Sequence, residues 1–223
     1  MIWVLGPSMC LPWSLDDPES GWPTLLSKKL NIPLTNLAEE AVDNFFIFNR
    51  YLEIKDQIQP NDILIIGWSH PSRKTFVLDR TNSNQTDILK ESLYYKTKNY
   101  EFIRSNNISN PDSLSKFANM RAILKSGRTK YFDTWYKDYY NDREQVCNFQ
   151  AYLDSVFLNS NKGKYFPFFI NEDSIKGITT NLNFGYMMNF ILKHNVAISD
   201  SDFHWNEKGH RLWANYLYTQ ITK

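Results

Sequence analysis

Residue types that can do chemistry are concentrated near the end of this chain, in the segment Asp200-Ser-Asp-Phe-His-Trp-Asn-Glu-Lys-Gly-His210. An acid two residues before a histidine can hold one imidazole nitrogen, so that the other nitrogen points outward as a general base. Such a base needs a nucleophile, and the best candidate is Ser8, on the turn after the apolar run Ile2-Trp-Val-Leu-Gly6. This combination predicts a serine that His204 deprotonates, and a scaffold that brings residue 8 to residue 204.

Several neighbouring acids and histidines leave a choice of roles. Asp200 and Asp202 both precede His204, and the spacing favours Asp202 as the acid that orients the ring. We expect His210 to pack against or cap the last helix, whereas His70 is either a surface loop residue or a substrate contact. The four histidines have no close metal-ligand spacing, so we expect neither a zinc site nor another cofactor.

Composition places the chain among ordinary globular proteins and excludes some partners. Its 223 residues, 42% hydrophobic and 22% charged, are enough for one domain with a sizeable core. A net charge of +1 gives no electrostatic reason to bind nucleic acid, and no apolar run is long enough to span a membrane. A first strand that begins at residue 2 leaves no room for a signal peptide, so we expect a cytoplasmic protein. Its two cysteines, Cys10 and Cys147, should be free thiols.

The first part of the chain alternates strands and helices with short connections. Strands are predicted at 2–5, 33–37 and 63–66, and helices at 22–30 and from Asp43 or Asn44 to about Ile58. The run Ile63-Leu-Ile-Ile66 is apolar on both faces, as is typical of a central strand in a parallel sheet. This order predicts a sheet with helices on both faces, which is a three-layer α/β/α sandwich.

The middle of the chain interrupts this alternation, and the end resumes it. Residues 72–112 lose periodicity and are rich in Asn, Ser, Thr and Lys, which indicates an insertion or lid rather than a second domain. A helical pattern follows from 113 to about 160, with a break near Ser126-Gly127. The last predicted elements are a strand at 165–170, a helix at 182–193, a short fifth strand at 196–199 and a final helix at 206–222. We therefore expect a single domain over residues 1–223, with a mainly parallel five-stranded sheet.

Reactive groups in a sheet of this kind gather beyond the carboxyl ends of the strands. Ser8 follows the first predicted strand, and residues 41–44 follow the second. Residues 68–70 follow the third strand, and Asp202 with His204 follows the fifth. Segments that are far apart in sequence are thus expected to meet at one edge of the sheet.

These four segments, in this order, resemble the motif blocks of the SGNH or GDSL-type hydrolases, over the whole chain except about residues 72–160. Gly6-Pro-Ser8 keeps the glycine and serine of the first block and has proline in place of its middle acid. Residues 36–44 resemble the second block, with Ala41 where glycine is usual. Residues 67–70 resemble the third, with Ser69 where asparagine is usual. The segment from Asp202 to His210 resembles the variant last block in which acid and histidine are two residues apart.

The resemblance implies a flavodoxin-like fold of the SGNH type and a serine esterase that uses no metal or nucleotide. Ser8, Asp202 and His204 would form its catalytic triad. The backbone N–H groups of Ser8 and Ala41, with the side chain of Asn44 or Ser69, would stabilise the tetrahedral oxyanion. Four residues next to these blocks are candidate substrate contacts: Trp68, His70, Arg73 and Trp205. The implied substrate is a small acyl ester, such as an acetyl group on a carbohydrate.

Two other functions are compatible with the same residues. The site can pass the acyl group to an acceptor hydroxyl instead of water, which would make the protein an O-acyltransferase, because the first half-reaction is common to both. The departures at Pro7, Ala41 and Ser69 point instead to a non-catalytic module that binds carbohydrate or protein, since a fold alone does not establish function. The presence of serine, acid and histidine together favours the hydrolase.

Overall fold

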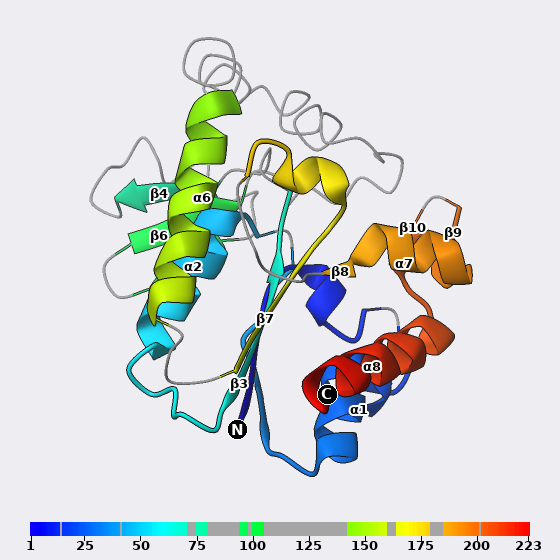
Figure 1. Cartoon of the computed structure of the whole chain (residues 1–223). Coiled ribbons are helices and arrows are strands. Elements are labelled where there is room, and N and C mark those ends of the chain that lie inside the picture. Colours follow the sequence, from blue (N-terminus) through cyan, green and yellow to red (C-terminus); the bar gives the residue numbers. More distant parts are fainter. Residues whose placement is uncertain are drawn as a thin grey trace.

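Parallel pairing of five strands builds the central sheet of this protein, here a computed structural model (Figure 1). The order across the sheet is β2 (Leu34–Asn36), β1 (Ile2–Leu5), β3 (Ile63–Trp68), β7 (Lys164–Phe169) and β8 (Gly185–Tyr186). With these five strands counted along the chain, the order is the flavodoxin-like 2-1-3-4-5. The predicted fold class is therefore confirmed.

The insertion predicted between the third and fourth strands is only partly described. The structure describes residues 1–13, 15–40, 42–70, 75–79, 94–97, 100–104, 142–159, 164–178, 185–200 and 202–223. Three strands of the insertion form a separate antiparallel sheet, with β6 (Tyr100–Arg104) between β4 (Thr75–Asp79) and β5 (Tyr94–Thr97). The helical segment predicted at 113–160 is described as α6 (Asp142–Asn159). The rest of both segments, including the break near 126–127, lies outside the described residues, so the lid and the single-domain organisation stay predictions.

Alternation along the strands divides the core into two halves, one on each face of the sheet. Two layers of helices cover these faces: α1 (Trp22–Leu30), α7 (Met187–His194) and α8 (Glu207–Ile221) on one, α2 (Asn44–Ile54) and α6 on the other (Figure 1). Ile2 and Val4 of β1 pack in the first half, whereas Trp3 and Leu5 pack in the second. Because β1 and β3 are buried on both faces, a site is expected beyond their carboxyl ends, which are Leu5 and Trp68.

Capping residues explain where two of the helices begin. Asp43 precedes α2, and its carboxylate accepts a hydrogen bond from the N–H three residues later at 2.8 Å. Asn206 caps α8 in the same way, by accepting from the Gly209 N–H at 2.9 Å. These predicted starts are confirmed. The predicted end of α2 near Ile58 is wrong, because the helix stops at Ile54. Ile58 is still buried, but it lies in the segment that follows the helix.

The end of the chain differs from the prediction in one strand. The segment expected to be the fifth strand of the sheet is β9 (Ala197–Ser199), which pairs antiparallel with β10 (Asp202–Trp205) in a separate ribbon. A parallel strand inside such a sheet is buried on both faces, but Ile198 and Ser199 are exposed. The true fifth strand, β8, has two residues and leaves too short a pattern to recognise. Because residues 185 and 186 are extended, α7 begins only at Met187.

Both cysteines are free thiols, as predicted, with Cys10 buried and Cys147 exposed. Burial strongly raises the pKa of the Cys10 thiol, so this side chain behaves as a small apolar residue in the core. Across the described ranges, none of the helices combines the length and the apolar content that a membrane crossing needs.

His210 lies in α8 but caps a different helix. Its side chain is 0% exposed, and its Nδ1 accepts a hydrogen bond at 3.1 Å from the N–H of Trp22, the first residue of α1. The first N–H groups of a helix have no partner within it, so this contact joins α8 to α1. Burial, followed by the nearby His204, lowers the pKa of His210 to about 4.

The buried His210 makes the fold sensitive to acid. Because the pKa is about 4 in the folded protein and about 6.5 in an unfolded chain, the unfolded state binds more protons between these values. The free energy of unfolding should therefore fall as the pH drops through this window, by about 1.4 kcal/mol for each pH unit. His210→Asn keeps an acceptor oxygen near the Nδ1 position and does not titrate. In urea unfolding at pH 7 and pH 5, the wild type should lose more stability than this variant; equal losses would contradict the assignment.

Candidate active site

Ser8 lies just beyond the carboxyl end of β1, on a turn that only glycine permits. Gly6 has a φ of +149°, and a Cβ placed there would lie 2.5 Å from the Cys10 Sγ and 2.8 Å from the Gly67 carbonyl oxygen. This left-handed conformation and the close approach of the β3 end both exclude a larger residue. The chain then forms a short 3-10 helix, η1 (Ser8–Cys10), in which Ser8 is 7% exposed.

Three side chains from the two ends of the chain form one line of hydrogen bonds. The Ser8 Oγ lies 2.7 Å from the His204 Nε2, although the residues are 196 positions apart. The other ring nitrogen, Nδ1, lies 2.6 Å from the Asp202 Oδ1, and the His204 backbone N–H donates to the same oxygen at 3.0 Å. Asp202 and His204 lie on β10 itself, and not after the fifth strand of the sheet as the sequence suggested. Asp202, and not the exposed Asp200, is the acid that holds the ring.

The charge of Asp202 sets the tautomer of the ring. Burial favours the neutral carboxyl, but the hydrogen bonds from the His204 backbone and ring outweigh it and lower the pKa of Asp202. An ionised Asp202 accepts hydrogen bonds only, so the ring carries its proton on Nδ1. The His204 Nε2 is then an acceptor, and the Ser8 hydroxyl donates to it. This arrangement can remove a proton from a serine that attacks a carbonyl.

A backbone carbonyl ties the Ser8 turn to the His204 strand. The Met9 carbonyl oxygen accepts hydrogen bonds from two indole groups, Trp22 Nε1 and Trp205 Nε1, each at 2.9 Å. Trp205 is 1% exposed, follows His204 directly and stacks on Trp213 of α8. Trp205, expected from the sequence as a substrate contact, therefore has its side chain buried in the contacts that join β10, η1 and the core.

The other candidate substrate contacts lie at the carboxyl end of β3 and just after it. Trp68, another expected substrate contact, is 0% exposed and donates from Nε1 to the Tyr165 hydroxyl at 2.9 Å, so its side chain lies in the core. His70 is partly buried at the end of this strand. Arg73 lies outside the described residues, and so does Ala41, one of the expected oxyanion donors.

Two buried polar groups at this edge have unused hydrogen-bonding capacity. The Ser69 N–H donates to the Asn44 Oδ1 at 2.7 Å, which fixes the orientation of the Asn44 amide. Asn44 is 5% exposed and Ser69 is 0% exposed. The Asn44 Nδ2 and the Ser69 Oγ have no hydrogen-bond partner within the described part of the chain. Buried donors of this kind are rare in folded proteins, and a bound group that accepts from them is one explanation.

The sequence interpretation missed Trp13. Its indole stacks on the His204 imidazole, with ring centroids 4.9 Å apart and planes 22° apart. Trp13 follows Ser8 by five residues in a loop without periodicity, so no pattern in the sequence pointed to this contact. The only available signal was a large aromatic side chain close to the nucleophile candidate.

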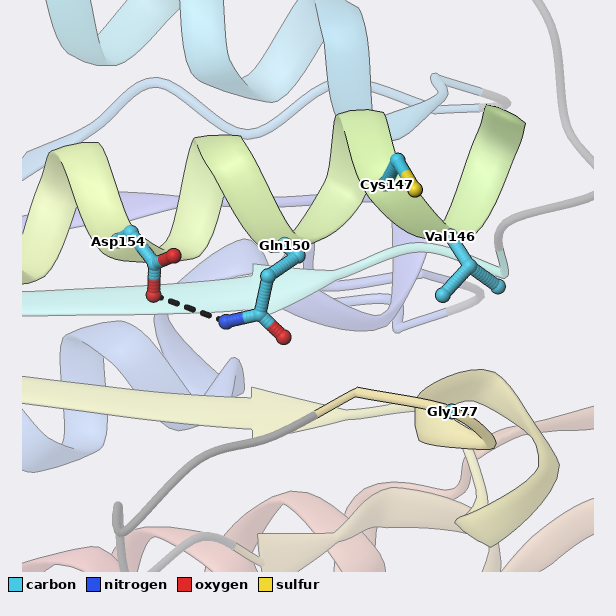
Figure 2. Close-up of a pocket in the computed structure, with 5 residues that line it drawn as sticks. All are labelled: Val146, Cys147, Gln150, Asp154 and Gly177. Atoms are coloured by element: carbon cyan, nitrogen blue, oxygen red, sulfur yellow. Dashed lines mark hydrogen bonds between the residues drawn. The ribbon is translucent and has the colours of Figure 1, made fainter. Parts of the chain in front are cut away.

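Two hollows in the described part of the molecule lie apart from the Ser8–His204 contact. The larger, of about 550 Å³, lies between α6 and the turn at Gly177 and is lined by Val146, Cys147, Gln150, Asp154 and Gly177 (Figure 2). Within it, the Gln150 amide donates to the Asp154 carboxylate at 2.8 Å. The smaller, of about 320 Å³, is lined by residues that include Leu15, Asp16 and Ile198. Neither is lined by Ser8, Asp202 or His204.

The structure of this chain is similar to solved structures of other proteins. No protein-family model and no curated protein matches the sequence. A member of the lipolytic protein G-D-S-L family from Veillonella parvula DSM 2008 matches with a TM-score of 0.51 and 12% identity, over 100% of this chain and 98% of that chain. The psychrotrophic esterase EstA from Pseudoalteromonas sp., in a structure inhibited by monoethylphosphonate, matches with a TM-score of 0.52 and 13% identity, over 99% of this chain and 96% of that chain. The chain therefore has the fold of the G-D-S-L lipolytic proteins and esterases.

Proposed function

We propose that this protein is a serine esterase that cleaves a small acyl ester through an acyl-serine intermediate. Ser8 is the nucleophile, His204 the general base and acid, and Asp202 the residue that orients the imidazole. The observation that carries the proposal is the hydrogen-bonded line from the Ser8 Oγ through both ring nitrogens to the Asp202 Oδ1, at 2.7 and 2.6 Å. Proton transfer needs contacts of about this length, and serine needs such a base to become nucleophilic.

The reaction divides into two half-reactions. The Ser8 Oγ attacks the ester carbonyl carbon while its proton moves to the His204 Nε2, and the carbonyl oxygen becomes an oxyanion. The C–O bond to the leaving alcohol then breaks, and the alcohol oxygen takes the proton from Nε2. Water attacks the resulting acyl-serine, again giving a proton to Nε2. Collapse of this second intermediate returns the proton to Ser8 and releases the carboxylic acid.

A small acyl group, such as acetyl on a carbohydrate, is the substrate class that the sequence resemblance favours. A panel of acetyl, butyryl and octanoyl nitrophenyl esters and an acetylated sugar tests this choice. Activity that rises with chain length would overturn the acetyl assignment and leave the nucleophile assignment untouched. Transfer to an added alcohol in preference to water would identify an O-acyltransferase.

Labelling with a serine-reactive fluorophosphonate tests the nucleophile itself. The reagent should modify one serine, and mass spectrometry should find it on the peptide that contains Ser8. Ser8→Ala should abolish labelling, whereas the matched control Ser20→Ala should leave it unchanged, because the Ser20 hydroxyl donates to Asp17 and has no histidine partner. A folded wild type that is neither labelled nor active on any ester would be a binding module.

Asn44 and Ser69 are the side-chain candidates for the oxyanion. The contact from the Ser69 N–H to the Asn44 Oδ1 leaves the Asn44 Nδ2 as a fixed donor, whereas the Ser69 hydroxyl can rotate. Asn44→Ala should therefore lower kcat by about 10²- to 10³-fold with little change in KM, and Ser69→Ala should lower it less. Asn44→Asp keeps an acceptor for the Ser69 N–H but replaces the donor with a carboxylate oxygen, whose negative charge also repels the oxyanion, so its loss of kcat should be at least as large as that of Asn44→Ala. Wild-type kcat in Asn44→Asp would remove Asn44 from the oxyanion site.

A further inference from the structure

Among the described residues, Trp13 is a close neighbour of the His204 ring that has no assigned role, besides the hydrogen-bonded partners Ser8 and Asp202. Hydrogen bonds to Ser8 and Asp202 lie at its two nitrogens, in the plane of the imidazole. Contacts of this kind leave the two faces of the ring open. Trp13 covers one of them, at 4.9 Å between centroids and 22° between planes. This near-parallel stack restricts the tilt of the ring, which the in-plane hydrogen bonds restrict less.

Two contacts hold the residues just before Trp13 in its loop. At its start, the Leu11 N–H donates to the Ser8 carbonyl oxygen at 3.0 Å, so the path to Trp13 begins at the nucleophile turn. Pro12 packs closely on Gly21, where an added Cβ would lie only 2.8 Å from the Pro12 Cβ. Gly21 precedes α1, so the helix start fixes the position of the loop. One short segment thus presents both the hydroxyl and the indole to the same imidazole.

We propose that Trp13 is a positioning residue that holds the His204 imidazole toward Ser8 and stabilises its positive charge when the ring takes the serine proton. This inference rests on the proposed esterase function. The π-face of tryptophan attracts a cation within about 6 Å of its centroid, more strongly than the other aromatic side chains do. Among the described residues, the titratable or charged groups near His204 are Asp202 on the same strand and His210 in α8. Asp202 stabilises the imidazolium at one edge, and Trp13 acts on the face.

Two substitutions distinguish the effect of the Trp13 π-face from the effect of covering the His204 ring with any apolar side chain. Trp13→Leu keeps an apolar side chain over the ring and removes the π-system, whereas Trp13→Phe retains a smaller π-face. We expect Trp13→Leu to lower kcat on a nitrophenyl acetate by about 5- to 30-fold with KM nearly unchanged. Trp13→Phe should recover part of this loss. The acid limb of the kcat/KM pH profile should move to lower pH in Trp13→Leu, because an imidazolium without the indole is less stable; lost packing alone does not predict this shift.

Proton NMR of the histidine ring hydrogens provides a readout that is independent of activity, with His204→Gln used to assign the His204 signals. Stacking on an indole displaces these signals, so Trp13→Leu should move them strongly and Trp13→Phe less. Unmoved signals, wild-type kcat in Trp13→Leu, or a raised KM at constant kcat would each overturn the inference, the last by making Trp13 a substrate contact. If the wild type has no esterase activity, the proposed function and the charge-stabilising role both fail, while the NMR shifts still decide whether Trp13 holds the ring.

Discussion

Ser8→Ala and His204→Ala should each lower the turnover of a short-chain nitrophenyl ester by about 10⁴- to 10⁶-fold. The reason is that neither residue works without the other: the serine hydroxyl is a poor nucleophile until a base takes its proton, and the base has no second nucleophile within the described site. The Ser8 Oγ and the His204 Nε2 are 2.7 Å apart, so in the proposed mechanism they act as one unit. Turnover is measured from nitrophenol release, with circular dichroism to check that each variant is folded.

A double variant and a second histidine variant test whether Ser8 and His204 act together. Ser8→Ala combined with His204→Ala should be no slower than the slower single variant, because removing one partner already disables the other. His194→Ala is the matched control for the histidine, since His194 lies at the end of α7 and contacts Phe190, whereas the hydrogen bonds to Ser8 and Asp202 are made by His204. Losses that multiply in the double variant, or wild-type activity in His204→Ala, would show that another residue is the base.

Asp202→Asn should lower kcat by about 10²- to 10⁴-fold while the protein stays folded. An asparagine at this position can present its N–H₂ group to Nδ1, which favours the tautomer with the proton on Nε2. That nitrogen then cannot accept the Ser8 proton. The carboxylate also stabilises the imidazolium that forms during each half-reaction, and the amide does not. The measurement is kcat at a pH well above the acid limb of the wild-type profile.

Asp200→Asn is the matched control for the choice between the two acids. Asp200 has the same chemistry, lies two residues earlier and is exposed, whereas the Asp202 Oδ1 lies 2.6 Å from the ring. Asp200→Asn should therefore keep nearly the wild-type kcat. A large loss in Asp200→Asn together with a small one in Asp202→Asn would reassign the orienting acid and require a different conformation of the β9–β10 ribbon.

Local chemistry in the sequence was sufficient to predict most of the strands and the starts of two helices. Apolar runs such as Ile63-Leu-Ile-Ile66 mark strands that are buried on both faces, and Asp43 and Asn206 mark helix starts because their side chains accept from free N–H groups. The pairing of Ser8 with Asp202 and His204 was also predicted, from an acid two residues before a histidine and a serine just after the first strand, although the structure places the acid and the histidine on the separate β9–β10 ribbon. These features depend on residues that are close in sequence or on the parallel order itself.

Only the tertiary structure decided how the remaining side chains are used. Trp68 and Trp205 flank site motifs in the sequence, yet each buries its indole and donates to an internal acceptor from a distant segment. In the sequence, Trp13 is an ordinary loop residue. In the structure it stacks on His204, because the close contact of Pro12 with Gly21 directs its loop over the ring. The identity of a side chain sets what it can donate, accept or stack on. Which of these capacities is used depends on partners that only the packing of remote segments brings within reach.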